Sequence, residues 1–345
     1  MWLAGPSAVA AGLEPGPEYA ALPDTGKIRY WISESFGNIY KNPDLALLQS
    51  EKAIELAEEL DQDKWRASAI NSVGTVHWAK GNFKEALEAY KSSHRLFTSV
   101  NDSLGMAKAA NNIGLVYLNM SIYDLSLEAL LEALAYFEPH PDKRNLPTLY
   151  NNIANVHARN DDQVKAEAYY RKALKAFEAN RDTNSISMVH NNLGLVMHRL
   201  KDNNKALDHY LTAKAGYESQ GNMLAVASVL TNIGSVYIDR EQAEAAEEAY
   251  KQSLKIARDM KNPYDEAIAH LKLAELYVKT DRYEASISAG QAALRIGEGP
   301  QGLLQLASAH EALSLAFEYN GQADSALVHR KTFMALNDSI FNQEK

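Results

Sequence analysis

The chain of 345 residues has no cysteine, which excludes a disulfide framework, a thiolate zinc site and a cysteine nucleophile. This absence fits a reducing cytoplasm and a cysteine-poor bacterial periplasm equally well, so it leaves the compartment open. No run of about 18 apolar residues occurs, so no membrane-spanning helix is expected. Proline and glycine are few, at 10 and 18 residues, and 46% of the residues are hydrophobic, so a sizeable core can form.

Basic charge is also scarce. The net charge is −9, and the lysines and arginines are spread thinly without a basic run. Nucleic-acid binding depends on clustered positive charge, so no nucleic-acid partner is expected. The same balance disfavours an anionic membrane surface, and we expect no membrane contact by this fragment.

The opening segment, residues 1–26, is rich in glycine, proline and alanine and is expected to be a disordered leader. Its Ala8-Val9-Ala10 resembles the cleavage site at the end of a clipped signal peptide. No basic stretch precedes that site, so a cloning scar or a plain disordered leader is the favoured interpretation. Residues 27–345 form the remaining region.

The rest of the chain repeats itself every 40 residues. A column of small residues contains Gly74, Gly114, Ala154, Gly194, Gly234, Ala274 and Ser314, and a second column, twelve residues later, contains Ala86, Ser126, Ala166, Ala206, Ala246, Ser286 and Ala326. A third column holds Tyr90, Leu130, Tyr170, Tyr210 and Tyr250. Small residues at fixed sites in two successive helical patterns indicate two helices that cross closely. Helix-ending stretches such as "NRDTN" (180–184) separate the copies, so we predict helix–turn–helix units without strands.

The stretch "NSVGTVHWAKGNFKEALEAYKSSHRLF" (71–97) resembles the tetratricopeptide repeat, and the resemblance covers about residues 28–345. The usual repeat has about 34 residues; the longer period here is similar to kinesin light chains and to sensor regions of certain bacterial regulators. The resemblance implies an all-α, right-handed superhelical solenoid of about eight helix pairs, with a concave face built by the first helices. The first copy departs from the pattern with Glu34 in the glycine column, and the last two copies lack the paired asparagines.

Those asparagine pairs occupy two different faces of the first helix. With the glycine column numbered position 8 and about 100° per residue, the apolar positions leave one strip free, made of positions 2, 5, 9, 12 and 13. Position 6 lies at the border of the buried arc, and we predict that its asparagines bond backbone groups of the adjoining repeat. Position 5 lies on the free strip and holds Asn71, Asn111, Asn151, Asn191 and then Thr231. Such a row of amides can donate to and accept from the main chain of an extended peptide, although a merely solvated role stays open.

Other residues of the free strip are candidate ligand contacts that would give selectivity. They are Lys108, Leu115, Asn155, Arg159, Leu195, His198 and Arg199. Basic groups lie in the central copies and acidic groups such as Glu275 lie later, so we hypothesise a ligand with an acidic end near Arg159 and Arg199 and a basic end near Glu275. Scattered exposed side chains without a role are the alternative.

No catalytic constellation is visible. His190, His270 and His310 fall on the core-facing position 4, and no H-E-x-x-H pair occurs, so packed or hydrogen-bonded histidines are expected rather than metal ligands. "GEGPQG" (297–302) lacks the lysine of a phosphate loop and is interpreted as a repeat junction. We therefore expect no catalytic residue, no metal and no cofactor, and we do not expect an enzyme.

The ending "FMALNDSIFNQEK" (333–345) resembles the segment that closes the repeat region in bacterial sensor histidine kinases, cyclases and transcription regulators. There the helix proceeds into a coiled coil, which implies a truncated last helix here and a homodimer through the missing coiled coil. The expected function is recognition of a protein or extended peptide segment, as the sensory or interaction part of a bacterial signalling protein. A stand-alone adaptor for complex assembly and an enzyme of an unrecognised kind are the alternatives. Localisation stays unknown, with the periplasm favoured over the cytoplasm because such repeats often face it.

Overall fold

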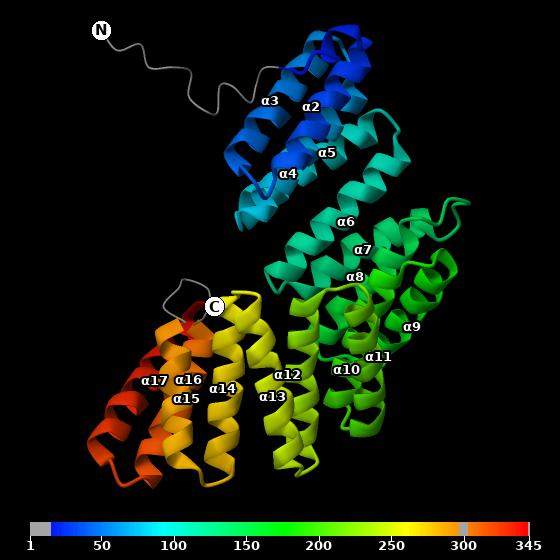
Figure 1. The fold of residues 1–345 in the computed structure, drawn as a ribbon. Helices are drawn as coiled ribbons and strands as arrows, with labels where there is room; N and C mark the ends of the chain where they lie inside the picture. The colour runs from blue at the N-terminus through cyan, green and yellow to red at the C-terminus, as the bar shows by residue number, and fades with distance from the viewer. Residues whose placement is uncertain (1–14, 297–302, 344–345) are drawn as a thin grey trace, which may run out of the picture. The chain divides into compact units, whose positions relative to one another are not determined.

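The computed structural model describes residues 15–296 and 303–343 (Figure 1). Within these ranges the regular structure is helical throughout, with a short 3-10 helix η1 (Tyr19–Ala21) followed by consecutive pairs of α-helices. The first helices are α2 (Asp24–Asn38), α4 (Asp63–Ala79), α6 (Ser103–Asn119), α8 (Leu146–Arg159), α10 (Thr183–Arg199), α12 (Met223–Asp239), α14 (Pro263–Lys279) and α16 (Leu303–Tyr319). The second helices are α3 (Pro43–Glu59), α5 (Phe83–Ser99), α7 (Tyr123–Phe137), α9 (Gln163–Asn180), α11 (Asn203–Ser219), α13 (Ala243–Asp259), α15 (Tyr283–Ile296) and α17 (Ala323–Gln343). The predicted all-α class and the eight helix pairs are confirmed.

Each 40-residue repeat contains two helices, and both helices end in the same kind of turn. A residue with positive φ ends most helices at intervals of 20 residues, as at Asp61, Gly81, Asn101, Ser121, Asp161, Arg181, Lys201, Gly221, Glu241, Lys261 and Asp281. The backbone N–H after it bonds back to the preceding helix; Asp102 N, for example, donates to Phe97 O at 2.9 Å. This bond satisfies a carbonyl at the helix end and stops the helix. Several of the next helices begin with a side-chain cap, and the Asp102 carboxylate accepts from Gly105 N at 3.2 Å. The helix ends are therefore fixed locally, by turn and cap residues.

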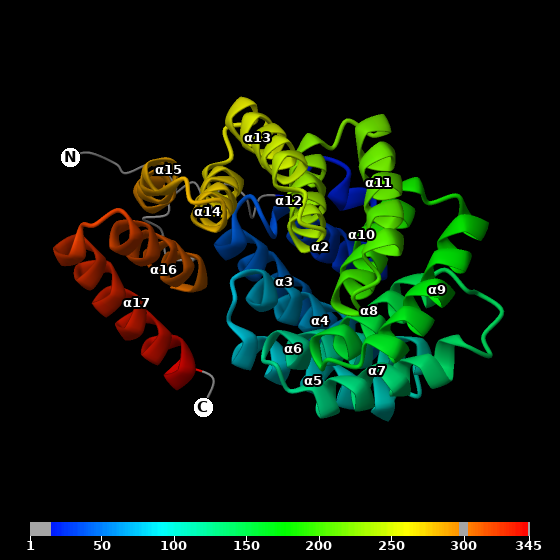
Figure 2. The same ribbon diagram turned by 90° about the horizontal axis from the view of Figure 1, so that it is seen from below.

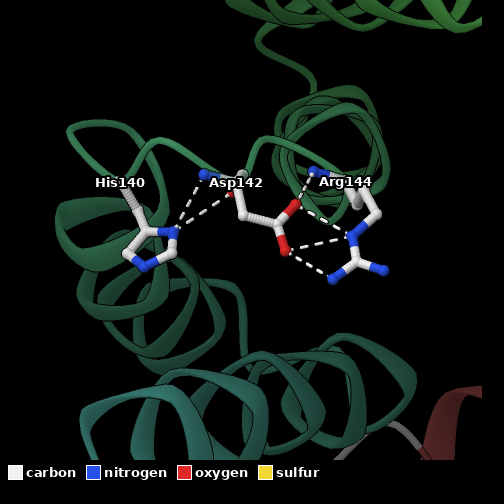
Figure 3. A network of polar contacts seen from close by, with 3 residues as sticks. All are labelled: His140, Asp142 and Arg144. Atoms are coloured by element: carbon white, nitrogen blue, oxygen red, sulfur yellow. Dashed lines mark hydrogen bonds and ion pairs between the residues drawn. The ribbon is translucent and has the colours of Figure 1, made fainter.

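The loop between α7 and α8 departs from this turn. Figure 3 shows how Asp142 closes it: its carboxylate accepts from Arg144 Nε at 2.9 and 3.0 Å and from Arg144 Nη2 at 2.6 Å, while its backbone N–H donates to His140 Nδ1 at 3.1 Å. The hydrogen bonds from Arg144 lower the pKa of Asp142 to about 2. The loop is thus ordered by its own side chains, and α8 then begins with the buried Leu146 and Pro147.

The small-residue columns mark the close crossing within each helix pair. A Cβ atom added at Gly74, Gly194 or Gly234 would lie 2.7, 2.6 or 2.3 Å from the tyrosine ring on the partner helix, at Tyr90, Tyr210 and Tyr250 respectively. At Gly114 the neighbour is the Leu130 side chain, at 2.6 Å. The second column also holds the pair together, since Ser126 Oγ donates to Gly114 O at 2.7 Å. The sequence prediction of two closely crossing helices is therefore confirmed.

The helices fall into two compact units, one ending at Ala176 and the other beginning at Phe177, within α9. In the first unit α2 contacts α4, α4 contacts α6 and α6 contacts α8; in the second, α10 contacts α12, α12 contacts α14 and α14 contacts α16. Successive second helices, such as α11 and α13, make no comparable contact within the described residues. Figure 2 shows α10 and α12 on one side of the second unit and α11 and α13 on the other. The first helices therefore line one face of each unit, called the inner face below.

The end of the expected disordered leader is ordered where the structure describes it. The Tyr19 ring packs against Tyr30 and Trp31, with centroids 5.2 and 5.8 Å apart, and Gly16 N donates to the Tyr30 hydroxyl at 2.9 Å. The sequence did not reveal this because aromatic residues flanked by Gly and Pro carry no periodicity. Residues 1–14, with the cleavage-like Ala8-Val9-Ala10, and the junction 297–302 lie outside the described residues. None of the described helices has the length and apolar character needed to cross a membrane.

Candidate functional site

The paired asparagines form a ladder that links successive repeats. Asn112 Nδ2 donates to Asn71 Oδ1 at 3.3 Å and Asn152 Nδ2 donates to Asn111 Oδ1 at 2.9 Å, both in the first unit. In the second unit Asn232 Nδ2 donates to Asn191 Oδ1 at 3.1 Å. In each case position 6 donates to position 5 of the preceding repeat. The predicted inter-repeat role of position 6 is present, but the predicted backbone partner is wrong, because the acceptor is a side-chain amide.

The ladder uses the oxygen of each of these position-5 amides and leaves the nitrogen of some of them without a partner in the described part of the chain. The oxygens of Asn71, Asn111 and Asn191 accept from the next repeat, whereas the amide nitrogens of Asn71 and Asn191 donate to no group among the described residues. These side chains are half-buried, while Asn151 is only 5% exposed. An amide has two donor hydrogens, so the inner face offers N–H donors rather than an even mixture of donors and acceptors. Acceptor groups, such as peptide carbonyls or carboxylates, fit such a row.

Thr231 continues the position-5 column, but its hydroxyl bonds groups within its own repeat and does not face the inner surface. Its Oγ1 donates to Ala227 O at 3.2 Å and lies 3.0 Å from Ser253 Oγ on α13. Of the predicted contacts in the first unit, Lys108 and Arg159 are exposed and Leu115 is half-buried. Thr231 therefore has partners within its own repeat, whereas these three side chains reach the surface.

The predicted contacts on α10 are Leu195, His198 and Arg199. Leu195 is 40% exposed, and Arg199 is exposed at the end of the helix. His198 Nε2 lies 3.1 Å from Asp239 Oδ2, to which Lys201 also donates at 3.2 Å. Burial alone would raise the pKa of Asp239, but these two hydrogen bonds hold it below its usual range.

One acidic residue of the predicted ligand contacts is already paired within the protein. Lys272 Nζ donates to Glu275 Oε2 at 2.8 Å, so Glu275 already has a cationic partner. Arg159 belongs to the first unit and Arg199 to the second. The hypothesis of a ligand with an acidic end near both arginines and a basic end near Glu275 stays a prediction.

A recess of about 180 Å³ opens on the inner face of the second unit. Residues from α10, α12, α13 and α14 line it, namely His198, Ser235, Ile238, Asp239, Tyr250, Lys272, Glu275, Leu276 and Lys279. Sites for drug-sized ligands measure about 300–1,000 Å³, so this recess has room for a single side chain or chain end.

Position 9 of the free strip has a role that sequence reasoning missed. The Tyr90 hydroxyl donates to Thr75 Oγ1 at 3.1 Å, and the Tyr250 hydroxyl lies 3.2 Å from Ser235 Oγ. The Tyr170 hydroxyl likewise donates to Asn155 Oδ1 at 2.5 Å, which gives this predicted ligand contact a partner inside the repeat. Burial raises the pKa of both Tyr90 and Tyr250 to about 12. The signal was available, since each of these tyrosines follows a polar residue by 15 positions.

Two pairs of histidines are present, and each pair joins the two helices of its own repeat. His190 Nδ1 and His209 Nδ1 are 3.0 Å apart, and His310 Nδ1 and His329 Nδ1 are 2.8 Å apart. Burial lowers the pKa of His190, His310 and His329. In residues 15–296 and 303–343, no cluster of three or more histidine, aspartate or glutamate side chains is placed to hold a metal ion.

Models of the tetratricopeptide repeat match residues 105–179, 185–259 and 231–302, which together span more than half of the chain. No curated protein sequence matches significantly.

Similar solved structures include the apo form of RapI, with a TM-score of 0.70 and 15% identity over 94% of this chain and 89% of that one. The apo form of the quorum sensor NprR from B. thuringiensis has a TM-score of 0.69 and 14% identity, over 91% and 88%. A Rap protein complexed with competence and sporulation factor has a TM-score of 0.60 and 16% identity, over 93% and 100%. At these identities the likeness concerns the fold.

Proposed function

Because the chain belongs to the tetratricopeptide-repeat family, we propose that it is a non-catalytic module that binds a protein segment or extended peptide along the inner faces of its units. The donor row at position 5 is the observation that carries this proposal. Asn71 in the first unit and Asn191 in the second each keep their N–H donors, whereas Asn111 uses one of its own on Asn112 Oδ1 at 3.3 Å and Asn151 is buried. Each available amide can therefore bind a main-chain carbonyl of an extended segment on its own unit. Main-chain carbonyls are the acceptors common to all peptides.

A role in bacterial signalling is the finer part of the proposal. Its support is the likeness in fold to a quorum sensor and to a Rap protein complexed with competence and sporulation factor. In such a role the inner face receives the signal, and a bound segment alters the output of an attached or associated protein.

The sequence predicts a homodimer through a coiled coil that continues the last helix, and we propose that α17 itself contributes to this contact. On α17 the side chains of Leu327, Val328 and Met334 are 52, 63 and 60% exposed, and a partner helix would remove them from water. Light scattering coupled to size-exclusion chromatography tests this contact. If the protein is a monomer at all concentrations, the proposed dimer through α17 is wrong.

Aspartate at position 5 tests the donor row without breaking the ladder. In Asn191→Asp the carboxylate still accepts from Asn232, but the two N–H donors are gone and a negative charge faces any carbonyl. With a pool of random heptapeptides as the probe, we expect Asn191→Asp to retain the wild-type helix content and melting temperature and to lose most peptide retention.

Asn232→Ala is the matched control, since it removes the ladder bond but keeps the Asn191 nitrogen. It should lower the melting temperature and retain peptides below that temperature. Equal retention by the wild type and the Asn191→Asp variant, or no retention by the wild type, would contradict the proposal.

A further inference from the structure

Tyr210 breaks the rule that the other tyrosines of its column follow. Its side chain is fully buried, and its hydroxyl has no hydrogen-bond partner within residues 15–296 and 303–343. The hydroxyls of Tyr90 and Tyr250 meet a polar side chain at position 9 of the same repeat, Thr75 and Ser235 respectively. In the repeat of Tyr210, position 9 is Leu195.

Packing within the chain does not explain why position 9 of this repeat is the apolar Leu195. A buried hydroxyl without a partner disfavours the folded state. A threonine or serine in place of Leu195 would supply a partner, as Thr75 does for Tyr90 and Ser235 for Tyr250. Leu195 also gains little from burial, since 40% of it remains exposed. At Leu115 an apolar residue causes no such conflict, because its partner helix carries Leu130 instead of a tyrosine.

The surroundings of Leu195 on α10 indicate what covers it. Asn191 and Arg199 lie one helical turn before and after it, and residues four apart share one face of a helix. Asn191 offers its N–H donors there, because its oxygen is held by Asn232. An exposed apolar surface beside a main-chain donor is suited to a peptide residue whose carbonyl is bound and whose side chain is apolar.

We propose that Leu195 is a specificity-determining contact that receives an aliphatic or aromatic side chain of the bound peptide. The inference rests on the proposed function and adds a preference to it. Residues that break a local rule tend to be those that function requires. Here the unpaired Tyr210 hydroxyl is the consequence of keeping position 9 apolar.

Two variants of the full chain separate stability from recognition. Leu195→Thr gives the Tyr210 hydroxyl an acceptor, so its melting temperature should rise. Peptides that the wild type enriches from a random heptapeptide pool should bind it about tenfold more weakly, since small changes in apolar contact alter recognition by that order. Tyr210→Phe removes the unpaired hydroxyl and leaves Leu195 in place, so its melting temperature should also rise while its peptide affinities stay unchanged.

The outcomes are distinguishable. If the wild type enriches peptides but Leu195→Thr binds them with unchanged affinity, the role of Leu195 is overturned and the peptide-binding function stands. Equal loss of affinity in Leu195→Thr and Tyr210→Phe indicates a structural effect and also overturns it. No enrichment by the wild type rejects the proposed function and this inference together. Leu195→Ser provides the same comparison if the threonine variant does not fold.

Discussion

Replacing Gly234 by alanine tests the close helix crossing, because two effects of opposite sign compete there. Gly234 lies inside α12, where alanine is the better helix former by about 1 kcal/mol. The added Cβ, however, would lie 2.3 Å from a ring atom of Tyr250. Carbon atoms in contact are roughly 3.5 Å apart, and the ring is only 2% exposed and cannot move into solvent. Overpacking by such an overlap costs about 3 kcal/mol, so we expect a net loss of about 2 kcal/mol.

Hydrogen exchange is the suitable assay, because a repeat array need not unfold in one step. A loss of about 2 kcal/mol should accelerate exchange of the protected amides of α12 and α13 about 30-fold. In a Tyr250→Ala background there is no ring to displace, and the same Gly234→Ala change should be neutral or stabilising. The difference between the two backgrounds measures the coupling between the residues directly.

Gly37→Ala is the matched control, since Gly37 lies within α2 and a Cβ there meets nothing within 4 Å. It should stabilise the protein by about 0.5 kcal/mol through helix propensity, less than the value for Gly234, because Gly37 is the second-last residue of α2 and not in its interior. Slower exchange or a higher melting temperature in Gly234→Ala would refute the steric reasoning.

Three further predictions concern polar contacts. Asn152→Ala should destabilise the first unit by about 1–2 kcal/mol in urea denaturation, because it removes the 2.9 Å bond to the half-buried Asn111 oxygen. Burial lowers the pKa values of His310 and His329 below those of the unfolded chain, so the melting temperature should fall as the pH drops below about 6.5, and His329→Gln should flatten this dependence. Glu247→Gln should cost about 2 kcal/mol, mostly retained in high salt, because this carboxylate is 17% exposed and accepts three charged or hydroxyl donors.

The sequence predicted the fold well because the fold depends on recurring residues. The small residues in two columns identify where helices cross, and their spacing gives the pairing of each helix with the next. The turns were harder to assign by residue type, since Ser121, Arg181 and Lys201 adopt the positive φ that glycine or asparagine would favour. Their regular interval, rather than their chemistry, locates them.

The candidate site was predicted less completely, because a helical wheel describes one helix at a time. It places Asn155 and His198 on the free strip but shows neither the Tyr170 hydroxyl that bonds the first nor the Asp239 carboxylate that pairs with the second. These partners lie on other helices. Sequence pattern therefore identifies which side chains face inward, while their remaining hydrogen-bonding capacity depends on the packed structure.

The asparagine pair shows how the period itself carries this missing information. Repeats of equal length place equivalent positions side by side, and an offset of one residue brings position 6 opposite position 5 of the preceding repeat. Two adjacent amides per repeat are then needed, one to donate and one to accept. Where the pair is lost, at Leu271 and Lys272, the Lys272 side chain instead forms an ion pair with Glu275 within α14, and this contact does not link two repeats. The doublet is therefore explained by contact between repeats, and the donors it leaves over are what the inner face can offer to a ligand.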